Sequence, residues 1–298
     1  MVEMSSAVEL DEVACPFCGL CCDDLRIRVD SGRLDVVKNG CSLSQKRYKE
    51  SSIDDEAVTF TPRVNNRPAT LESAVDRVTE IFRESRLPVI AGLATDVSGA
   101  RAAMDLADRC GAVVDHINSA GLFRNLHVLQ DSGWMTATLT EIRNRADLLI
   151  IIGEKIFERF PRLLERVITP KKTLWKDDWK PMFLKGAHQR DLVLIRPTSA
   201  SPLPEMLAKR NPTILSVPME RIGEMAALLR AILSDAPLQA ESVGDVDINT
   251  LRDLATRLKQ AKYSGVTWFA GELEFPHAEL AIEAWSERFG RASCRERV

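Results

Sequence analysis

The stretch DLLIIIG, residues 147–153, is the strongest strand signal in the chain. Its five consecutive aliphatic residues are too few for a buried helix, and they fit a strand that is covered on both faces. Similar short apolar runs recur at 88–93, 112–117, 191–196, 213–218 and 264–270. Runs of this kind, separated by amphipathic segments, predict an α/β fold with parallel sheets flanked by helices.

The segments between these runs carry apolar residues spaced three and four positions apart, as amphipathic helices do. The clearest example is 71–86, which Thr70 precedes as a suitable N-cap. We expect helices at 71–86, 100–110, 122–130, 140–146, 220–234, 248–261 and 276–289. Segment 235–247 is expected to be a loop or linker.

The composition of the 298-residue chain is that of a folded globular protein, with 45% hydrophobic and 28% charged residues. Forty Lys and Arg against 43 Asp and Glu leave a net charge of −3, which argues against binding nucleic acid through bulk charge. No apolar run approaches the ~20 residues of a membrane span. The acidic start of the chain lacks a secretory signal pattern, so we expect a cytoplasmic protein.

Five of the seven cysteines lie within the first 41 residues. The spacing C-x2-C-x3-C-x18-C selects four of them as candidate metal ligands: Cys15, Cys18, Cys22 and Cys41. Alternating segments at 25–29 and 34–37 predict a β-hairpin that returns the fourth thiol toward the other three. Because cytosolic thiols stay reduced, the cluster favours a metal over disulfides. Three near ligands and one remote ligand favour a [4Fe–4S] cluster, with zinc or simple buried cysteines as alternatives.

These patterns divide the chain into a small Cys-rich N-terminal β domain, 1–57, and an α/β domain, 58–290. Segment 170–189 interrupts the α/β pattern with tryptophans among lysines. We interpret it as a docking surface for a partner subunit, with packing on its own domain as the alternative. The irregular tail, 291–298, is interpreted as an artefactual truncation of a domain that naturally continues, or else as a frayed terminus.

Other candidate residues carry weaker signals. We expect Asp23 and Asp24 to cap backbone N–H groups of the cysteine loop beside them. His116 follows a strand beside Asp115, and a hydrogen-bonded structural role is favoured over catalysis. The chain contains neither a G-x-G-x-x-G motif nor a phosphate-binding G-x-x-x-x-G-K-S/T motif, so nothing in the sequence favours a nucleotide enzyme.

The string CPFCGLCCDD at 15–24, followed by a hairpin and the NGC string at 39–41, resembles the start of the B subunit of formylmethanofuran dehydrogenase. A second stretch resembles the same family: Gly133, then TLTEIRNRAD at 138–147 and a strand that ends at Gly153. The resemblance covers part of the chain only, with the motifs in the family's order. It implies a molybdopterin-oxidoreductase-like α/β core and an N-terminal [4Fe–4S] cluster. In the archaeal enzymes of this family, the B subunit holds a tungsten or molybdenum bis-pterin and reduces CO2 to formate, so the resemblance also implies this cofactor.

The chain departs from this family at the metal ligand. In the dehydrogenases a cysteine or selenocysteine binds the metal in the loop upstream of the second motif. The corresponding segment here, 118–124, contains no cysteine, and Gly121 falls near the ligand position. The FPRL string at 160–163 likewise lacks the family's histidine. Because tungsten and molybdenum require a soft donor, we expect no tungsto- or molybdopterin in this chain.

These losses make the chain look more like the B subunit of the bacterial formyltransferase/hydrolase complex of methylotrophs. This resemblance implies tetrahydromethanopterin-linked one-carbon metabolism (formaldehyde oxidation), with hydrolase-type and formyltransferase-type partner subunits that hold the catalytic sites. The chain itself would be a scaffold from an oxidoreductase family. Two alternatives stay open: an active tungsto- or molybdopterin formylmethanofuran dehydrogenase subunit, and a zinc-stabilised α/β binding module.

Overall fold

The computed structural model describes residues 7–51, 61–170 and 190–293. It divides into two compact units, one formed by residues 1–52 together with 121–298, and one formed by 53–120. The Cys-rich segment therefore belongs to the same compact unit as the carboxyl-terminal half of the chain. This division differs from the sequence-based one at 57/58, because long-range contacts bring the two segments together.

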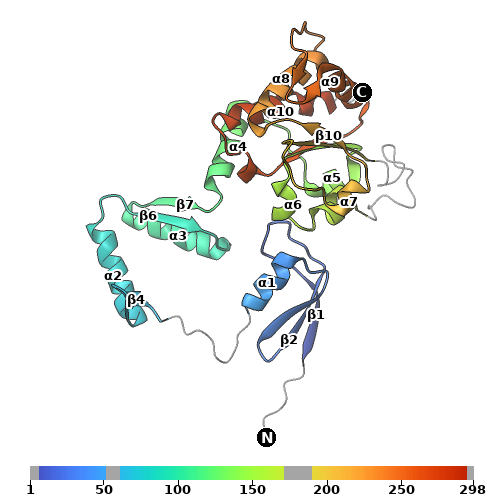
Figure 1. The fold of residues 1–298 in the computed structure, drawn as a ribbon. Coiled ribbons are helices and arrows are strands. Elements are labelled where there is room, and N and C mark those ends of the chain that lie inside the picture. The colour runs from blue at the N-terminus through green and yellow to red at the C-terminus, as the bar shows by residue number, and fades with distance from the viewer. Residues whose placement is uncertain (1–6, 52–60, 171–189, 294–298) are drawn as a thin grey trace, which may run out of the picture. The chain divides into compact units, whose positions relative to one another are not determined.

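The N-terminal strands form an antiparallel sheet of order β1-β2-β3 (Figure 1). Its strands are β1 (Val8–Val13), β2 (Leu25–Asp30) and β3 (Arg33–Lys38). The hairpin predicted between the last two strands is confirmed. Leu25 and Ile27 of β2 are buried in a small core with Cys15 and Cys22. Helix α1 (Ser42–Glu50) follows the sheet.

The central sheet is entirely parallel, with the order β10-β9-β8-β13. Its strands are β8 (Leu148–Ile152), β9 (Asp191–Arg196), β10 (Thr213–Ser216) and β13 (Ser264–Trp268). All five residues of β8 are at most 2% exposed, as expected for a strand covered on both faces. The α/β fold class with a parallel sheet and flanking helices is confirmed.

Alternate residues of β8 enter two different cores, one on each face of the sheet. Ile150 packs with α8 (Ile222–Leu233), α9 (Ile248–Gln260) and α10 (Ala278–Ser293). Leu149 and Ile151 pack on the opposite side. That side is covered by α5 (Leu139–Arg145), α6 (Lys155–Arg159), η1 (Leu164–Ile168) and α7 (Glu205–Ala208). Helix α4 (Ser119–Asp131) contributes Val128 to the first core.

The unit 53–120 contains a parallel strand pair, β6 and β7, with two helices. Its elements are β4 (Arg63–Val64), β5 (Arg67–Pro68), α2 (Leu71–Glu84), β6 (Val89–Leu93), α3 (Val97–Cys110) and β7 (Val113–His116). Thr70 caps α2, as predicted, by accepting a hydrogen bond from the N–H of Ser73. Helix α3 begins earlier than expected because Asp96 accepts the N–H of Gly99 at 2.7 Å.

Several sequence expectations differ from the structure. The segment expected as a loop at 235–247 contains the short antiparallel strands β11 (Ser242–Val243) and β12 (Val246–Asp247). Helix α10 continues to Ser293, past the glycine at 290 where we expected it to end. Residues 171–189 and 294–298 lie outside the described ranges, so the docking role of 170–189 and the nature of the tail stay predictions.

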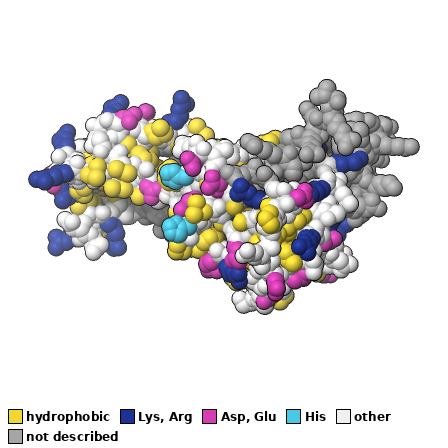
Figure 2. All heavy atoms as spheres, turned by 90° about the horizontal axis from the view of Figure 1, so that it is seen from above, with side chains coloured by type: hydrophobic (Ala, Val, Ile, Leu, Met, Phe, Trp, Pro, Cys, Tyr) yellow, Lys and Arg dark blue, Asp and Glu magenta, His cyan; other side chains and the backbone are white. Residues whose placement is uncertain are grey.

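Within the described ranges, no helix is both long and apolar enough to cross a lipid bilayer. On the face seen in Figure 2, acidic side chains lie among the basic ones. This mixture agrees with the nearly balanced charge of the sequence.

Candidate functional site

The cysteine loop between β1 and β2 closes on itself. The N–H of Cys15 donates to the carbonyl oxygen of Cys22 at 2.7 Å. Two left-handed residues turn the chain in between, Gly19 with φ of 76° and Cys21 with φ of 48°. Cys15 and Cys22 are 6% and 5% exposed, whereas Cys21 is exposed. The turn therefore separates Cys21 from the two buried thiols beside it.

The fourth candidate ligand, Cys41, is the N-cap of α1. Its Sγ accepts the N–H of Ser44 at 3.4 Å, and its own N–H donates to Ser44 Oγ at 2.9 Å. Asn39, with φ of 60°, donates from Nδ2 to the carbonyl oxygen of Asp24 at 2.7 Å. The Cys41 sulfur therefore lies at the N-terminus of α1, where it accepts a backbone N–H.

The thiols influence one another electrostatically. Burial raises the pKa of Cys15, and the nearby Cys18 and Cys41 raise it further. Burial also raises the pKa of Cys22, while the guanidinium groups of Arg162 and Arg166 oppose that increase. Electrostatic interactions thus link Cys15 with Cys18 and Cys41, and Cys22 with Cys18.

The arrangement is not a completed metal site. Among the described residues, no three His, Cys, Asp or Glu side chains form a group that could hold a metal ion. The donor set nevertheless suits an iron–sulfur cluster or zinc, because thiolates are the preferred ligands of both. The donor chemistry therefore fits, although the side chains do not converge as a finished ligand set.

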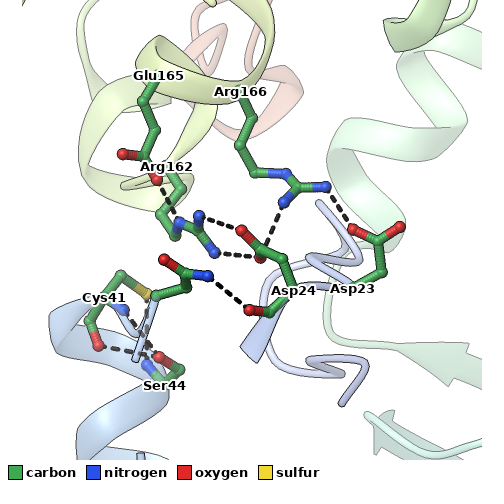
Figure 3. A network of polar contacts seen from close by, with 8 residues as sticks. Asp23, Asp24, Cys41, Ser44, Arg162, Glu165 and Arg166 are labelled. Carbon is green, nitrogen blue, oxygen red and sulfur yellow. Dashed lines mark hydrogen bonds and ion pairs between the residues drawn. The ribbon is translucent and has the colours of Figure 1, made fainter. Parts of the chain in front are cut away.

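Two acidic residues next to Cys22 connect this loop to the α/β core (Figure 3). Asp24 binds Arg162 through two hydrogen bonds of 2.6 and 2.7 Å. Arg166 lies 2.8 Å from Asp24 and donates to Asp23 at 2.6 Å. Glu165 accepts a further bond from Arg162. We call these five residues the Asp–Arg clamp.

The clamp differs from the expectation that Asp23 and Asp24 cap their own loop. Each carboxylate also interacts with its own backbone N–H, but the hydrogen bonds to arginine are the main cause of their lowered pKa values. The carboxylates of Asp24 and Glu165 in turn raise the pKa of Arg162. In the sequence, the i, i+4 spacing of Arg162 and Arg166 indicates that both side chains lie on one face of a helix. It does not indicate which residues they bind, because Asp24 lies 138 positions away in the chain.

Gly121, which the resemblance leads us to expect near the position of a metal ligand, lies in the first turn of α4 and not in a loop. A Cβ atom added there would be 3.2 Å from the carbonyl carbon of Ala270 and 3.3 Å from its oxygen. These atoms belong to backbone and cannot rotate away. Residues 118–124 contain no soft donor, and a Cβ atom at 121 would be in tight contact with Ala270; both observations argue against a tungsten or molybdenum ligand at this position.

We expect Gly121→Cys to lower the free energy of unfolding by about 1–3 kcal/mol, because overpacking forces the backbone apart. Ala120→Cys is the matched control, since Ala120 precedes Gly121 in the same helical turn and is exposed. Urea denaturation of both variants measures the difference. Equal stability of the two variants would show that the contact with Ala270 is not restrictive.

The remaining sequence candidates have structural partners. His116 accepts the N–H of Asn118 on Nδ1 at 3.2 Å, and its own backbone N–H donates to the Asp115 carboxylate at 2.9 Å. In the FPRL string, Phe160 packs edge-on against Phe269 with ring centroids 5.9 Å apart. Arg162 of the same string belongs to the Asp–Arg clamp.

No protein-family model matches the chain. It is 27% identical over 266 residues to the B subunit of the tungsten-containing formylmethanofuran dehydrogenase 2 of Methanocaldococcus jannaschii, and 24% identical over 264 residues to that of Methanococcus maripaludis. Each alignment covers 87% of this chain and 58% of the relative, so the chain spans little more than half the length of these relatives. It is also 35% identical over 92 residues to the B subunit of the formyltransferase/hydrolase complex Fhc of Methylorubrum extorquens, covering 31% of this chain and 25% of the relative.

Two solved structures share the fold. The formyltransferase/hydrolase complex FhcABCD of Methylorubrum extorquens, in complex with methylofuran, matches with a TM-score of 0.57 and 22% identity over 78% of this chain and 57% of the other. Acetylene hydratase from Pelobacter acetylenicus matches with a TM-score of 0.61 and 12% identity over 92% of this chain and 42% of the other. The resemblance found in the sequence motifs is thus confirmed: the chain has homologues named as the B subunits of formylmethanofuran dehydrogenase and of the formyltransferase/hydrolase complex.

Proposed function

We propose that this chain is a non-catalytic subunit of a formyltransferase/hydrolase complex, in which hydrolase-type and formyltransferase-type subunits carry out the reactions. The observation that carries the proposal is the close approach of Gly121 to the backbone of Ala270, where the related dehydrogenases have their metal ligand. Without a soft donor the chain has no means of holding tungsten or molybdenum in the family's way. Its role would then be to bind and position its partners.

The proposed cellular location and pathway rest on the same similarity to the B subunit of the formyltransferase/hydrolase complex. We place the complex in the cytoplasm, in tetrahydromethanopterin-linked one-carbon metabolism during formaldehyde oxidation. The mixed surface charge offers no support for nucleic acid as a partner.

Reconstitution tests the scaffold role. The full complex would be assembled from its hydrolase-type and formyltransferase-type subunits with and without this chain, and formyl transfer would be measured in both preparations. We expect the partners to co-purify with the chain and to lose coupled transfer when it is omitted. Partners that assemble and act equally well without it would contradict the proposal.

We further propose that Cys15, Cys18, Cys22 and Cys41 hold a [4Fe–4S] cluster, with zinc as the alternative. The electrostatic links among these thiols and the capping position of Cys41 support this assignment. A bound cluster would supply folding free energy to the N-terminal sheet and could also carry an electron.

Cysteine variants distinguish a cysteine that binds the metal from one that does not. We expect Cys22→Ser to lose the bound metal, because it removes a buried donor, whereas the matched variant Cys21→Ser should keep it, because Cys21 is exposed. Iron, acid-labile sulfide and zinc would be measured after anaerobic purification. Loss of metal in both variants, or in neither, would contradict the ligand set, and zinc without sulfide would favour the zinc-stabilised binding module.

A second candidate function is an active tungsto- or molybdopterin subunit of formylmethanofuran dehydrogenase. The specific observation in its favour is that the match to the tungsten-containing relatives extends over 87% of this chain. Tungsten or molybdenum analysis, together with the fluorescence of an oxidised pterin, distinguishes this candidate from the scaffold.

A further inference from the structure

Side chains from residues 39–48, the segment that carries Cys41, contact the loop that carries the other three candidate ligands. Both segments belong to the same compact unit. Three of these contacts, two hydrogen bonds and one ring contact, end at residues 14, 17 and 24. Each of these positions is at most two residues away from a different one of the three near cysteines.

The contact near Cys22 is made by Asn39. Its Nδ2 donates to the carbonyl oxygen of Asp24 at 2.7 Å. The bond joins the residue two positions before Cys41 to the residue two positions after Cys22. Asn39 has φ of 60°, a left-handed conformation that asparagine adopts more readily than most residues other than glycine. An asparagine therefore suits this position both for its backbone conformation and for its amide donor.

The other two contacts are made by Tyr48 of α1. Its hydroxyl donates at 3.2 Å to the carbonyl oxygen of Ala14, the residue immediately before Cys15. Its ring packs edge-on against that of Phe17, the residue immediately before Cys18, with centroids 5.0 Å apart. The fourth candidate ligand caps the same helix, so Tyr48 connects that helix to the segments beside two of the near ligands.

None of these three contacts uses a sulfur atom, so all of them exist without a metal. Within the loop, the bond from the N–H of Cys15 to the carbonyl oxygen of Cys22 also involves backbone atoms only. A set of ligands whose backbone is already held loses less conformational entropy when a metal binds, and it therefore binds the metal more tightly. Residues that orient ligands in this way affect metal affinity although they do not touch the metal.

We propose that Asn39 and Tyr48 are positioning residues that hold Cys41 beside the loop of the three near cysteines before a metal binds. The contacts of these two side chains, and not the metal, bring the remote ligand to the other three. The inference rests on the proposed ligand set, and it goes beyond that set by assigning a role to two side chains that are not ligands. It applies to an iron–sulfur cluster and to zinc, because four thiolates can hold either.

Anaerobic titration of the metal-free, full-length chain with Co2+ tests the proposal, because thiolate-to-cobalt absorption reports how many thiolates bind the ion. We expect four thiolates in the wild type and three in Cys41→Ser. In Asn39→Asp a carboxylate replaces the donor and is repelled by the carbonyl oxygen of Asp24. We expect this variant to bind Co2+ about tenfold more weakly, with the three-thiolate spectrum of Cys41→Ser.

Two milder variants and a control refine the test. Asn39→Gly keeps the left-handed backbone and Tyr48→Phe keeps the ring contact, but each loses one hydrogen bond. Both should keep four thiolates and bind Co2+ about 3–10-fold more weakly. Asn66→Asp is the matched control and should bind as the wild type does. Asn66 is exposed, has nearly the same backbone conformation, with φ of 62°, and belongs to the other compact unit.

The outcomes distinguish this inference from the ligand set on which it rests. Fewer than four thiolates in the wild type would contradict the ligand set, and the positioning role with it. Four thiolates and unchanged affinity in Asn39→Asp would overturn the positioning role alone, as would equal weakening in Asn66→Asp. If Asn39→Asp does not fold, Asn39→Gly and Tyr48→Phe serve instead, and wild-type affinity in both would overturn the proposal.

Discussion

Replacing Arg190 by methionine is expected to lower the free energy of unfolding by about 3–5 kcal/mol. The Arg190 side chain, 9% exposed, donates five hydrogen bonds of 2.7–2.8 Å to backbone carbonyl oxygens. The acceptors lie around the carboxyl ends of α5 and η1: Ile142, Arg143, Ala146, Val167 and Ile168. Methionine fills much of the same space, but it leaves these buried oxygens without their donor.

Burial lowers the pKa of Arg190 to about 10, so the side chain is still charged at neutral pH. The cation also lies where helix dipoles are negative, at their carboxyl ends. Arg252→Met is the matched control, since Arg252 is exposed on α9, and we expect it to change stability by less than ~0.5 kcal/mol. Urea denaturation measures both variants. Equal stability of the two would show that the carbonyl oxygens around Arg190 find other partners.

The second large effect is expected at the Asp–Arg clamp. Arg162→Met should cost about 2–3 kcal/mol, because the arginine side chain is only 11% exposed and makes a two-bond contact with Asp24. Asp24 is 35% exposed, so solvent screening places the coupling between the two residues at about 1–2 kcal/mol. The loss should be concentrated in the N-terminal sheet, which the clamp connects to the core.

A double-mutant cycle of Asp24→Asn and Arg162→Met measures this coupling directly. Amide hydrogen exchange locates the effect, with faster exchange expected in β2 and β3 than in β8. Arg47→Met is the matched control, because Arg47 is exposed and its ion pair with Glu50, at 3.3 Å, lies at the surface. A coupling near zero, or uniform exchange throughout the chain, would contradict a role of the clamp in holding the cysteine loop.

The parts of the fold that the sequence predicted are those set by local patterns. Five aliphatic residues identified β8 as a strand covered on both faces, and the alternation at 25–29 identified the first strand of the hairpin. The pair β11 and β12 was missed, although Gly244, with φ of 56°, marks the turn between them. Its strands are two residues each, which is too short for a period to be recognised.

The parts of the candidate site that the sequence did not predict depend on contacts between distant segments. The pairing of Asp24 with Arg162 joins residues 138 positions apart. Cysteine spacing can be used to predict four thiols as ligands, because ligand geometry constrains spacing. A charged residue that binds a backbone or guanidinium group far away in the chain produces no such spacing pattern in the sequence.

The proposal that this chain carries out no tungsten or molybdenum chemistry is tested most directly by a dye-linked assay on the anaerobically purified chain, alone and within the reconstituted complex. Formate and a formylated carrier would be offered with a low-potential viologen, and tungsten and molybdenum would be measured in the same sample. We expect no reduction of the dye and neither metal in the sample. Dye reduction that rises in proportion to bound tungsten or molybdenum would contradict the scaffold assignment and establish a working dehydrogenase subunit.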